Sequence, residues 1–221
     1  MTAISEFFPS QQHLREQIEF VLEIDRLKLV NRKTLLLDGT RPENSAEHSW
    51  HIAVMAILLA EHAGERLNLE RVLKMLLIHD IVEIDSGDSF CYDAKALQSQ
   101  ADREGAAAER LFGMLPDAQR ANLFEIWREF EAQASPEAIF AATVDRLQPL
   151  LFDCMSDGGT LRSSETTLEK VLARHQIIQA GSPVLADYAK QLIQTAARRG
   201  LIGERSEVEI DLPPENSASD N

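Results

Sequence analysis

Apolar residues recur every three or four positions along almost the whole chain, and this spacing restricts it to packed helices. In the first such segment Ile18, Val21, Leu22 and Ile24 fall on one helical face. No stretch alternates apolar and polar residues over a strand's length, so the pattern predicts no strand. We therefore predict an all-α bundle of about seven to eight helices, near residues 11–31, 44–62, 69–84, 95–115, 117–131, 136–155, 166–180 and 183–199.

The chain length suits one domain. Of the 221 residues, 44% are hydrophobic, which is enough for a single core. We predict that this domain spans residues 1–200. Residues 201–221 contain two prolines and many acidic residues, and this composition predicts a disordered acidic tail. Inside the domain, Asn44 followed three residues later by Glu47 predicts a capping box at the start of a helix.

The net charge of −14 limits the possible partners. About −5 of it belongs to the predicted tail, so the domain itself carries about −9. We predict no binding to a nucleic-acid polymer, because such binding relies on a broadly basic surface. An anionic small molecule could bind only through a metal ion or a few well-placed Arg and Lys side chains.

Two further features bear on location. The longest apolar run covers residues 52–60, far below the roughly 20 residues that cross a bilayer, so we predict no membrane span. Residues 1–12 contain no apolar run typical of a signal peptide. Only two cysteines occur, Cys91 and Cys154, which favours a reducing compartment. We expect a cytoplasmic protein.

The segment with the clearest chemistry is 76–84, an apolar stretch that carries His79, Asp80 and Glu83. On a helix these three residues share one side, since Glu83 follows the others by three and four positions. Burial of such a cluster is costly unless a charge compensates it, and a divalent metal would do so. His and Asp are suitable ligands, and a nearby carboxylate that is not a ligand can transfer a proton.

Two ligands do not complete a site, and other polar residues in apolar helices can supply the rest. His48 stands near the start of the apolar segment 50–59, and Asp145 stands within 139–147. With His79 and Asp80 they would form a set of two nitrogens and two oxygens. Such a set leaves positions open for water and a phosphate oxygen on a metal that prefers six ligands.

The ordered pattern of a lone His, an adjacent His-Asp pair and a distant Asp resembles the HD-domain metal-dependent phosphohydrolase superfamily. Four short sequence motifs narrow the resemblance to its 5′-deoxynucleotidase-like branch, HD_3. These motifs are Leu-Lys-Leu-Val-Asn-Arg at 27–32, Pro-Glu-Asn-Ser-Ala-Glu-His-Ser at 42–49, His-Asp-Ile-Val-Glu at 79–83 and Gly-Asp at 87–88. The resemblance covers roughly residues 14–199.

The resemblance implies a metal-dependent enzyme that hydrolyses nucleoside 5′-monophosphates to nucleoside and phosphate. Among these substrates, it implies deoxyribonucleoside 5′-monophosphates in particular. It implies one divalent metal, with Mn, Co, Fe, Ni, Zn and Mg all open. Glu83 and Asp80 would be catalytic, with Glu83 handling the proton of the attacking water or of the leaving 5′-oxygen. Arg32 would hold the phosphate, and the branch is commonly homodimeric. The implied metal ligands are His48, His79, Asp80 and Asp145, and the implied pocket residues are Lys33, Asp88 and Ser89.

One position departs from the branch. Where the resemblance expects an aromatic residue beside the sugar, this chain has Lys33, which makes a different nucleotide or a phosphodiester a plausible alternative substrate. A second alternative is a helical dimerisation or partner-binding protein with a structural metal. His51 is expected to be a half-buried neighbour of the ligands. His175 is expected at the surface or its boundary.

Overall fold

The structure, a computed structural model, describes residues 7–93 and 99–203. The prediction of an all-α fold is confirmed, since helices dominate these ranges. No helix in them combines the length and apolarity that a membrane span requires. The α-helices are α1 (Gln12–Ile24), α2 (Ser45–Leu59), α3 (Leu69–Ile78), α4 (Glu83–Ser86), α6 (Gln100–Phe112), α7 (Asp117–Ala132), α8 (Pro136–Met155), α9 (Leu168–Arg174), α10 (Ile177–Gly181) and α11 (Pro183–Arg198). Tighter 3-10 helices occupy Asp25–Leu29, Ala60–His62, His79–Val82 and Gly159–Arg162.

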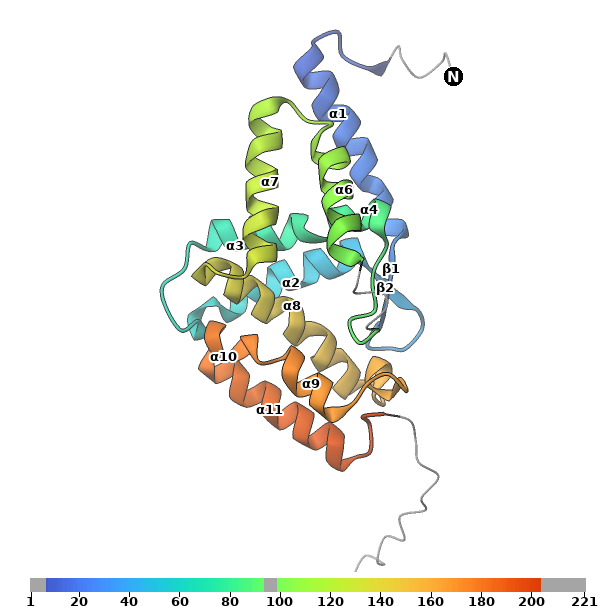
Figure 1. Cartoon of the computed structure of the whole chain (residues 1–221), viewed down its shortest axis with the longest axis vertical. Helices are drawn as coiled ribbons and strands as arrows, with labels where there is room; N and C mark the ends of the chain where they lie inside the picture. Colours follow the sequence, from blue (N-terminus) through green and yellow to red (C-terminus); the bar gives the residue numbers. More distant parts are fainter. Residues whose placement is uncertain (1–6, 94–98, 204–221) are drawn as a thin grey trace, which may run out of the picture.

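The helices form three groups along the length of the molecule (Figure 1). Helices α2, α3 and α8 form the middle of the molecule and contact one another. Helices α1, α6 and α7 extend toward one end, and α9, α10 and α11 cover the other. The longest helix, α8, therefore contacts both α2 and α3 on one side and α10 and α11 on the other.

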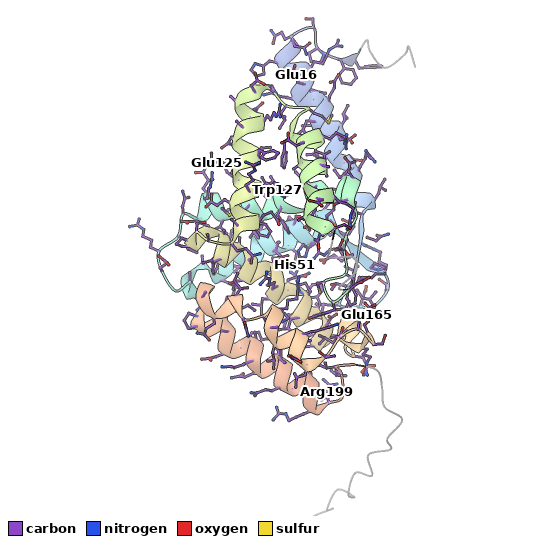
Figure 2. The ribbon with its side chains drawn as sticks, viewed as in Figure 1. Glu16, His51, Glu125, Trp127, Glu165 and Arg199 are labelled. Carbon is purple, nitrogen blue, oxygen red and sulfur yellow. The ribbon has the colours of Figure 1, made fainter. Side chains whose placement is uncertain are left out.

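Two groups of buried side chains hold this arrangement together. The first core lies around α2, α3, α8, α10 and α11, and includes Ile52, Met75 and Phe140. The second lies between α1, α6 and α7, and includes Phe112 and Trp127; Trp127 is labelled in Figure 2. Because burial of each large apolar side chain contributes about 1.5–3 kcal/mol, both cores are substantial. The segment 78–83 runs between the two cores.

Several helix starts follow the local sequence rules. The predicted capping box of α2 is present: the Asn44 side chain accepts from Glu47 N, and Glu47 reaches back to Asn44 N. Helix α8 begins with Pro136 after Ser135, whose hydroxyl accepts from the backbone of Ala138. Thus α8 matches its predicted range, and the ranges predicted for α7 and α11 are off by one residue at one end only.

The prediction that no strand occurs is wrong. Strands β1 (Asn31–Leu35) and β2 (Pro42–Asn44) form an antiparallel hairpin between α1 and α2. The inward residues of this hairpin include Arg32, Thr34 and Glu43, which are polar. Burial therefore alternates along β1 while hydropathy does not, and a pattern search based on hydropathy misses the strand.

Four predicted helices are also divided. The first ends as an α-helix at Ile24 rather than near residue 31, and the third ends at Ile78, where a 3-10 turn follows. The second ends as an α-helix at Leu59, and a 3-10 turn occupies the rest of its predicted range. Residues 166–180 split into α9 and α10. Apolar spacing of three and four fits both kinds of helix over one turn, so it cannot locate such breaks. The predicted tail beyond residue 203 and the predicted helix start near residue 95 lie outside the described residues, and the domain boundary at residue 200 stays a prediction.

Candidate active site

Four predicted ligands come together where α2, α8 and the 3-10 segment His79–Val82 meet. His48 lies in the first turns of α2, and Asp145 lies near the middle of α8. His48 Nε2 is 2.9 Å from Asp145 Oδ1, and His79 Nε2 is 3.7 Å from the same oxygen. One ligand atom from each of these three residues lies within 4.8 Å of the others. Asp80 adjoins them, since its Oδ1 is 2.9 Å from His79 Nε2.

The hydrogen bonds behind His48 determine where its proton lies. Glu43 is buried, and its carboxylate only accepts, so the amide nitrogen of Gln148 donates to it at 2.9 Å. The amide oxygen of Gln148 therefore faces His48 Nδ1, at 3.2 Å. Nδ1 must donate to this oxygen, which leaves a lone pair on Nε2, the atom beside Asp145.

His79 is oriented in the same way. Its Nδ1 lies 3.0 Å from the carbonyl oxygen of Leu76, which only accepts, so Nδ1 donates. Its Nε2 is buried and has no hydrogen-bond partner among residues 7–93 and 99–203. Two nitrogen lone pairs thus face two carboxylate oxygens, of Asp80 and Asp145. Four acceptors at such distances fit a shared cation, and this donor set suits a divalent metal.

The electrostatics of the cluster also favour a cation. Burial lowers the pKa of His79, but the carboxylates of Asp80 and Asp145 outweigh it and raise that pKa well above its ordinary value. Burial raises the pKa of Asp145, but its close contacts with His48 and then His79 hold that pKa well below its usual range. The pKa of Asp80 is also lowered against burial, first by the charge of His79. The two carboxylates therefore favour a positive charge between them, which a proton on His79 can supply and a metal ion could supply in its place.

Arg32 reaches the same cluster from β1. Its Nη1 donates to Asp80 Oδ2 at 2.8 Å, so Asp80 offers its other oxygen to the His79 side. Burial lowers the pKa of Arg32, but Asp80 and then Glu83 raise it further, so it keeps its charge. Its Nε is buried, and no described residue accepts a hydrogen bond from it. This free donor is suited to an anionic group in the adjoining cleft.

Glu83 is the first residue of α4 and is buried. The hydroxyl of Ser45 donates to its Oε2 at 2.6 Å. Burial, followed by the negative charge of Asp80, raises the pKa of Glu83 well above its ordinary value. A buried carboxyl group with a raised pKa is suited to proton transfer.

Two open clefts meet at this cluster. The inner cleft, of about 720 Å³, is lined by the carboxylates of Asp80, Glu83 and Asp145 and by His79. The outer cleft, of about 550 Å³, extends past the hairpin toward α9 and the 3-10 turn Gly159–Arg162. Both clefts share one wall, here called the partition, which is formed by Arg32, Asp88, Ser89, Cys91, Arg146 and Arg174.

The structure places the predicted pocket residues at this junction. Asp88 and Ser89 belong to the partition, and Lys33 lines the outer cleft from the exposed side of β1. Burial raises the pKa of Asp88, although Arg32 partly opposes this. His51, labelled in Figure 2, is half-buried behind the cluster, with Nδ1 3.4 Å from Gln148 Nε2.

Several residues of the site escape sequence reasoning. Glu43 and Gln148 support His48 from different segments, and no local pattern links them. Arg146 follows Asp145 directly, a signal that could have been used, whereas Arg174 lies far along the chain. The prediction that His175 lies at the surface or its boundary is wrong, since the residue is buried. It is 8% exposed, lines the outer cleft, and shares a hydrogen bond with the carbonyl of Val171.

Comparisons with known proteins agree with this geometry. A family model described as an HD domain, HD_3, matches residues 24–186. Human 5′-deoxynucleotidase HDDC2 is 30% identical over 152 residues, 68% of this chain and 73% of that protein. The 5′-deoxynucleotidase YfbR of Salmonella arizonae is 29% identical over 170 residues, 72% of this chain and 84% of its own.

A solved structure is also similar. A protein of Magnetospirillum magnetotacticum, named as a predicted metal-dependent phosphohydrolase, has 49% sequence identity and a TM-score of 0.82. The match covers 87% of this chain and 100% of that one. The resemblance that the sequence motifs indicated is confirmed.

Proposed function

The chain belongs to the HD domain family, and on this premise we propose that it is a metal-dependent phosphomonoesterase of nucleoside 5′-monophosphates. Water would attack the phosphorus, and the bond to the 5′-oxygen would break, which yields a nucleoside and inorganic phosphate. One observation carries the proposal: two imidazole lone pairs and two carboxylate oxygens converge beside a buried arginine with a free donor.

We propose that His48, His79, Asp80 and Asp145 hold one divalent metal. A metal in this set would neutralise phosphate charge and lower the pKa of water. Mn, Co, Fe, Ni, Zn and Mg all accept mixed nitrogen and oxygen ligands, so the ligand set leaves the metal's identity open. The similar Magnetospirillum protein is named a predicted metal-dependent phosphohydrolase, which supports this proposal.

The chain's own residues can perform the remaining steps. Arg32 would bind a phosphate oxygen through its free Nε while Asp80 holds its Nη1. Glu83 would transfer a proton to the leaving 5′-oxygen or from the attacking water, since it lines the inner cleft with Asp80. Asp88, Ser89 and Lys33 would contact the nucleoside in the outer cleft.

We propose deoxyribonucleoside 5′-monophosphates as the first substrates, because the curated relatives carry the name 5′-deoxynucleotidase. Lys33 is exposed at the rim of the outer cleft. A flexible lysine excludes a 2′-hydroxyl poorly, so we expect a small preference for deoxyribose over ribose.

We propose that the protein is a homodimer. Helix α2 is apolar on its outward face as well, and leaves Trp50 64% and Leu58 66% exposed. Val54 and Ile57 continue the same face. A contiguous apolar surface of this kind is typical of a protein interface. We also propose a cytoplasmic location, because both cysteines are free thiols.

Phosphate release tests the proposal. Protein stripped with a chelator and then supplied with Mn²⁺ or Co²⁺ is given dAMP, AMP and 3′-AMP. We expect release from the two 5′-monophosphates only when metal is added. No phosphate release from any of these monophosphates, with metal bound at one equivalent, would contradict the proposed function and favour the structural-metal alternative.

A further inference from the structure

Two arginines on the partition have no role in the reaction proposed above. Arg146 and Arg174 line both the inner and the outer cleft, as Arg32 does. Arg146 comes from α8, directly after the proposed ligand Asp145, and Arg174 comes from the last turn of α9. Two segments far apart in sequence therefore bring guanidinium groups to the place where the clefts meet.

Neither arginine forms an ion pair within the described part of the chain. Arg146 donates to two neutral acceptors, the backbone oxygen of Arg174 at 3.1 Å and the side-chain oxygen of Gln133 at 3.0 Å. By contrast, Arg71 and Arg110 each contact two carboxylates. The charge of Arg174 affects the pKa of the Cys91 thiol, of the Tyr92 hydroxyl and of two further basic groups, His175 and Arg146.

The outer cleft offers this pair no carboxylate partner among the described residues. Its own carboxylates are engaged elsewhere. Asp153 accepts from the backbone N–H and the hydroxyl of Thr160, and Asp88 interacts with Arg32. Two neighbouring, half-buried guanidinium groups that form no ion pair in the described part of the chain are suited to binding a phosphate.

We propose that Arg146 and Arg174 form a subsite for a second phosphate of the substrate. This inference rests on the proposed function, in which the scissile phosphate lies against the ligand cluster and Arg32. A second phosphate nearer the nucleoside would then meet the partition. The preferred substrate is a nucleotide with two neighbouring phosphates, and Lys33, also in the outer cleft, adds to the positive potential there.

Two substrates have this chemistry. In a nucleoside 3′,5′-bisphosphate, water attacks the 5′-phosphorus, the bond to O5′ breaks, and O5′ takes a proton. The products are a nucleoside 3′-phosphate and inorganic phosphate. In a nucleoside 5′-diphosphate, water attacks the terminal phosphorus, the bond to the bridging oxygen breaks, and the products are a nucleoside 5′-monophosphate and inorganic phosphate. Neither step needs another reactant.

The experiment compares kcat/KM for AMP, adenosine 3′,5′-bisphosphate and ADP with metal-loaded wild-type protein, and identifies the nucleoside product in each case. We expect at least one two-phosphate nucleotide to exceed AMP by tenfold or more, as a charge-assisted contact would give. A preference for adenosine 3′,5′-bisphosphate would show that the subsite binds a phosphate on the sugar. A preference for ADP would show that it binds a phosphate of the 5′-chain.

Variants assign the effect to the subsite. Arg174→Ala should reduce the ratio of two-phosphate to AMP kcat/KM by about 10- to 100-fold, and Arg174→Lys should retain part of it. Arg198→Ala is the matched control, since Arg198 also ends a helix but is exposed and donates to the Thr195 hydroxyl, away from both clefts. It should leave the ratio unchanged.

Two results would overturn the inference while the proposed function stands. One is wild-type hydrolysis of AMP that equals or exceeds that of both two-phosphate nucleotides. The other is an unchanged ratio in Arg174→Ala with an unaltered circular dichroism spectrum. Failure to release phosphate from all three nucleotides would overturn the proposed function and this inference together.

Discussion

The substitution Glu43→Gln tests whether the hydrogen bonds behind His48 prepare it to bind a metal. In the native site Glu43 accepts from Gln148, and its other oxygen lies 3.4 Å from His48 Nδ1. A glutamine at 43 has the same shape but carries an N–H group in place of one oxygen. Either orientation of the new amide brings an N–H group close to Nδ1, directly or through a flipped Gln148. This N–H group favours Nδ1 as an acceptor, and so shifts the proton toward Nε2, the proposed ligand atom.

Loss of an outer partner of a metal-bound histidine typically weakens metal affinity by about 10- to 100-fold, or about 1.4–2.7 kcal/mol. We expect this loss for Glu43→Gln, because Glu43 is 2% exposed and water cannot replace it. Competition with a chelator of known affinity measures it for Mn²⁺ and Co²⁺. Glu61→Gln, which removes the same charge from an exposed position after α2, should bind metal as wild type does.

A Glu43→Gln protein with unchanged thermal unfolding and metal affinity within about twofold of wild type would refute this reasoning. Glu43 would then support the hairpin and not the histidine. A variant that loses both folding and metal affinity would leave the two roles mixed, so Gln148→Leu provides a second measurement. Gln148 is fully buried on α8, outside the hairpin, and its removal should weaken metal affinity in the same direction.

Three further predictions follow from the site. Glu83→Gln should retain the metal and lower kcat by about 10²- to 10⁴-fold, as loss of a proton-transfer group does. Metal content and single-turnover rates measure this, and an unchanged rate would show that Glu83 does not take part in proton transfer. Chelation should abolish activity reversibly while circular dichroism at 25 °C changes little, because two apolar cores, rather than the metal, hold the helices together. Loss of helical signal on chelation would indicate a structural metal. Burial lowers the pKa of His175 to about 4 from 6.5, so the unfolded chain binds more protons than the folded chain between these pH values. The free energy of unfolding should therefore fall by about 3 kcal/mol as the pH drops through this window. Urea unfolding at pH 7 and pH 4.5 should show a smaller loss of stability for His175→Gln than for wild type, and equal losses would contradict this prediction.

The sequence predicts most of the fold because most of its helices bury one apolar face. The range of α8 and the capping box of α2 follow from local rules that the structure obeys. The ligand candidates could be predicted for a related reason: His48, His79 and Asp145 are polar residues within apolar segments. Such a residue has either a structural partner or a function. The supporting residues Glu43 and Gln148 could not be predicted, since their contact joins positions 105 residues apart.

The errors of the sequence prediction are concentrated at the site. The unpredicted hairpin supplies Arg32 and Glu43, and the 3-10 turn that ends α3 carries His79 and Asp80. The break after α9 lies beside Arg174 and His175. In each case a buried polar side chain replaces the apolar residue that periodicity expects, or a backbone turn aims it at the clefts. Rules based on burial of apolar surface fail where a chain buries polar groups for binding. The location of these failures is therefore a further argument, independent of any relative, that the two clefts and their partition are the functional surface of this protein.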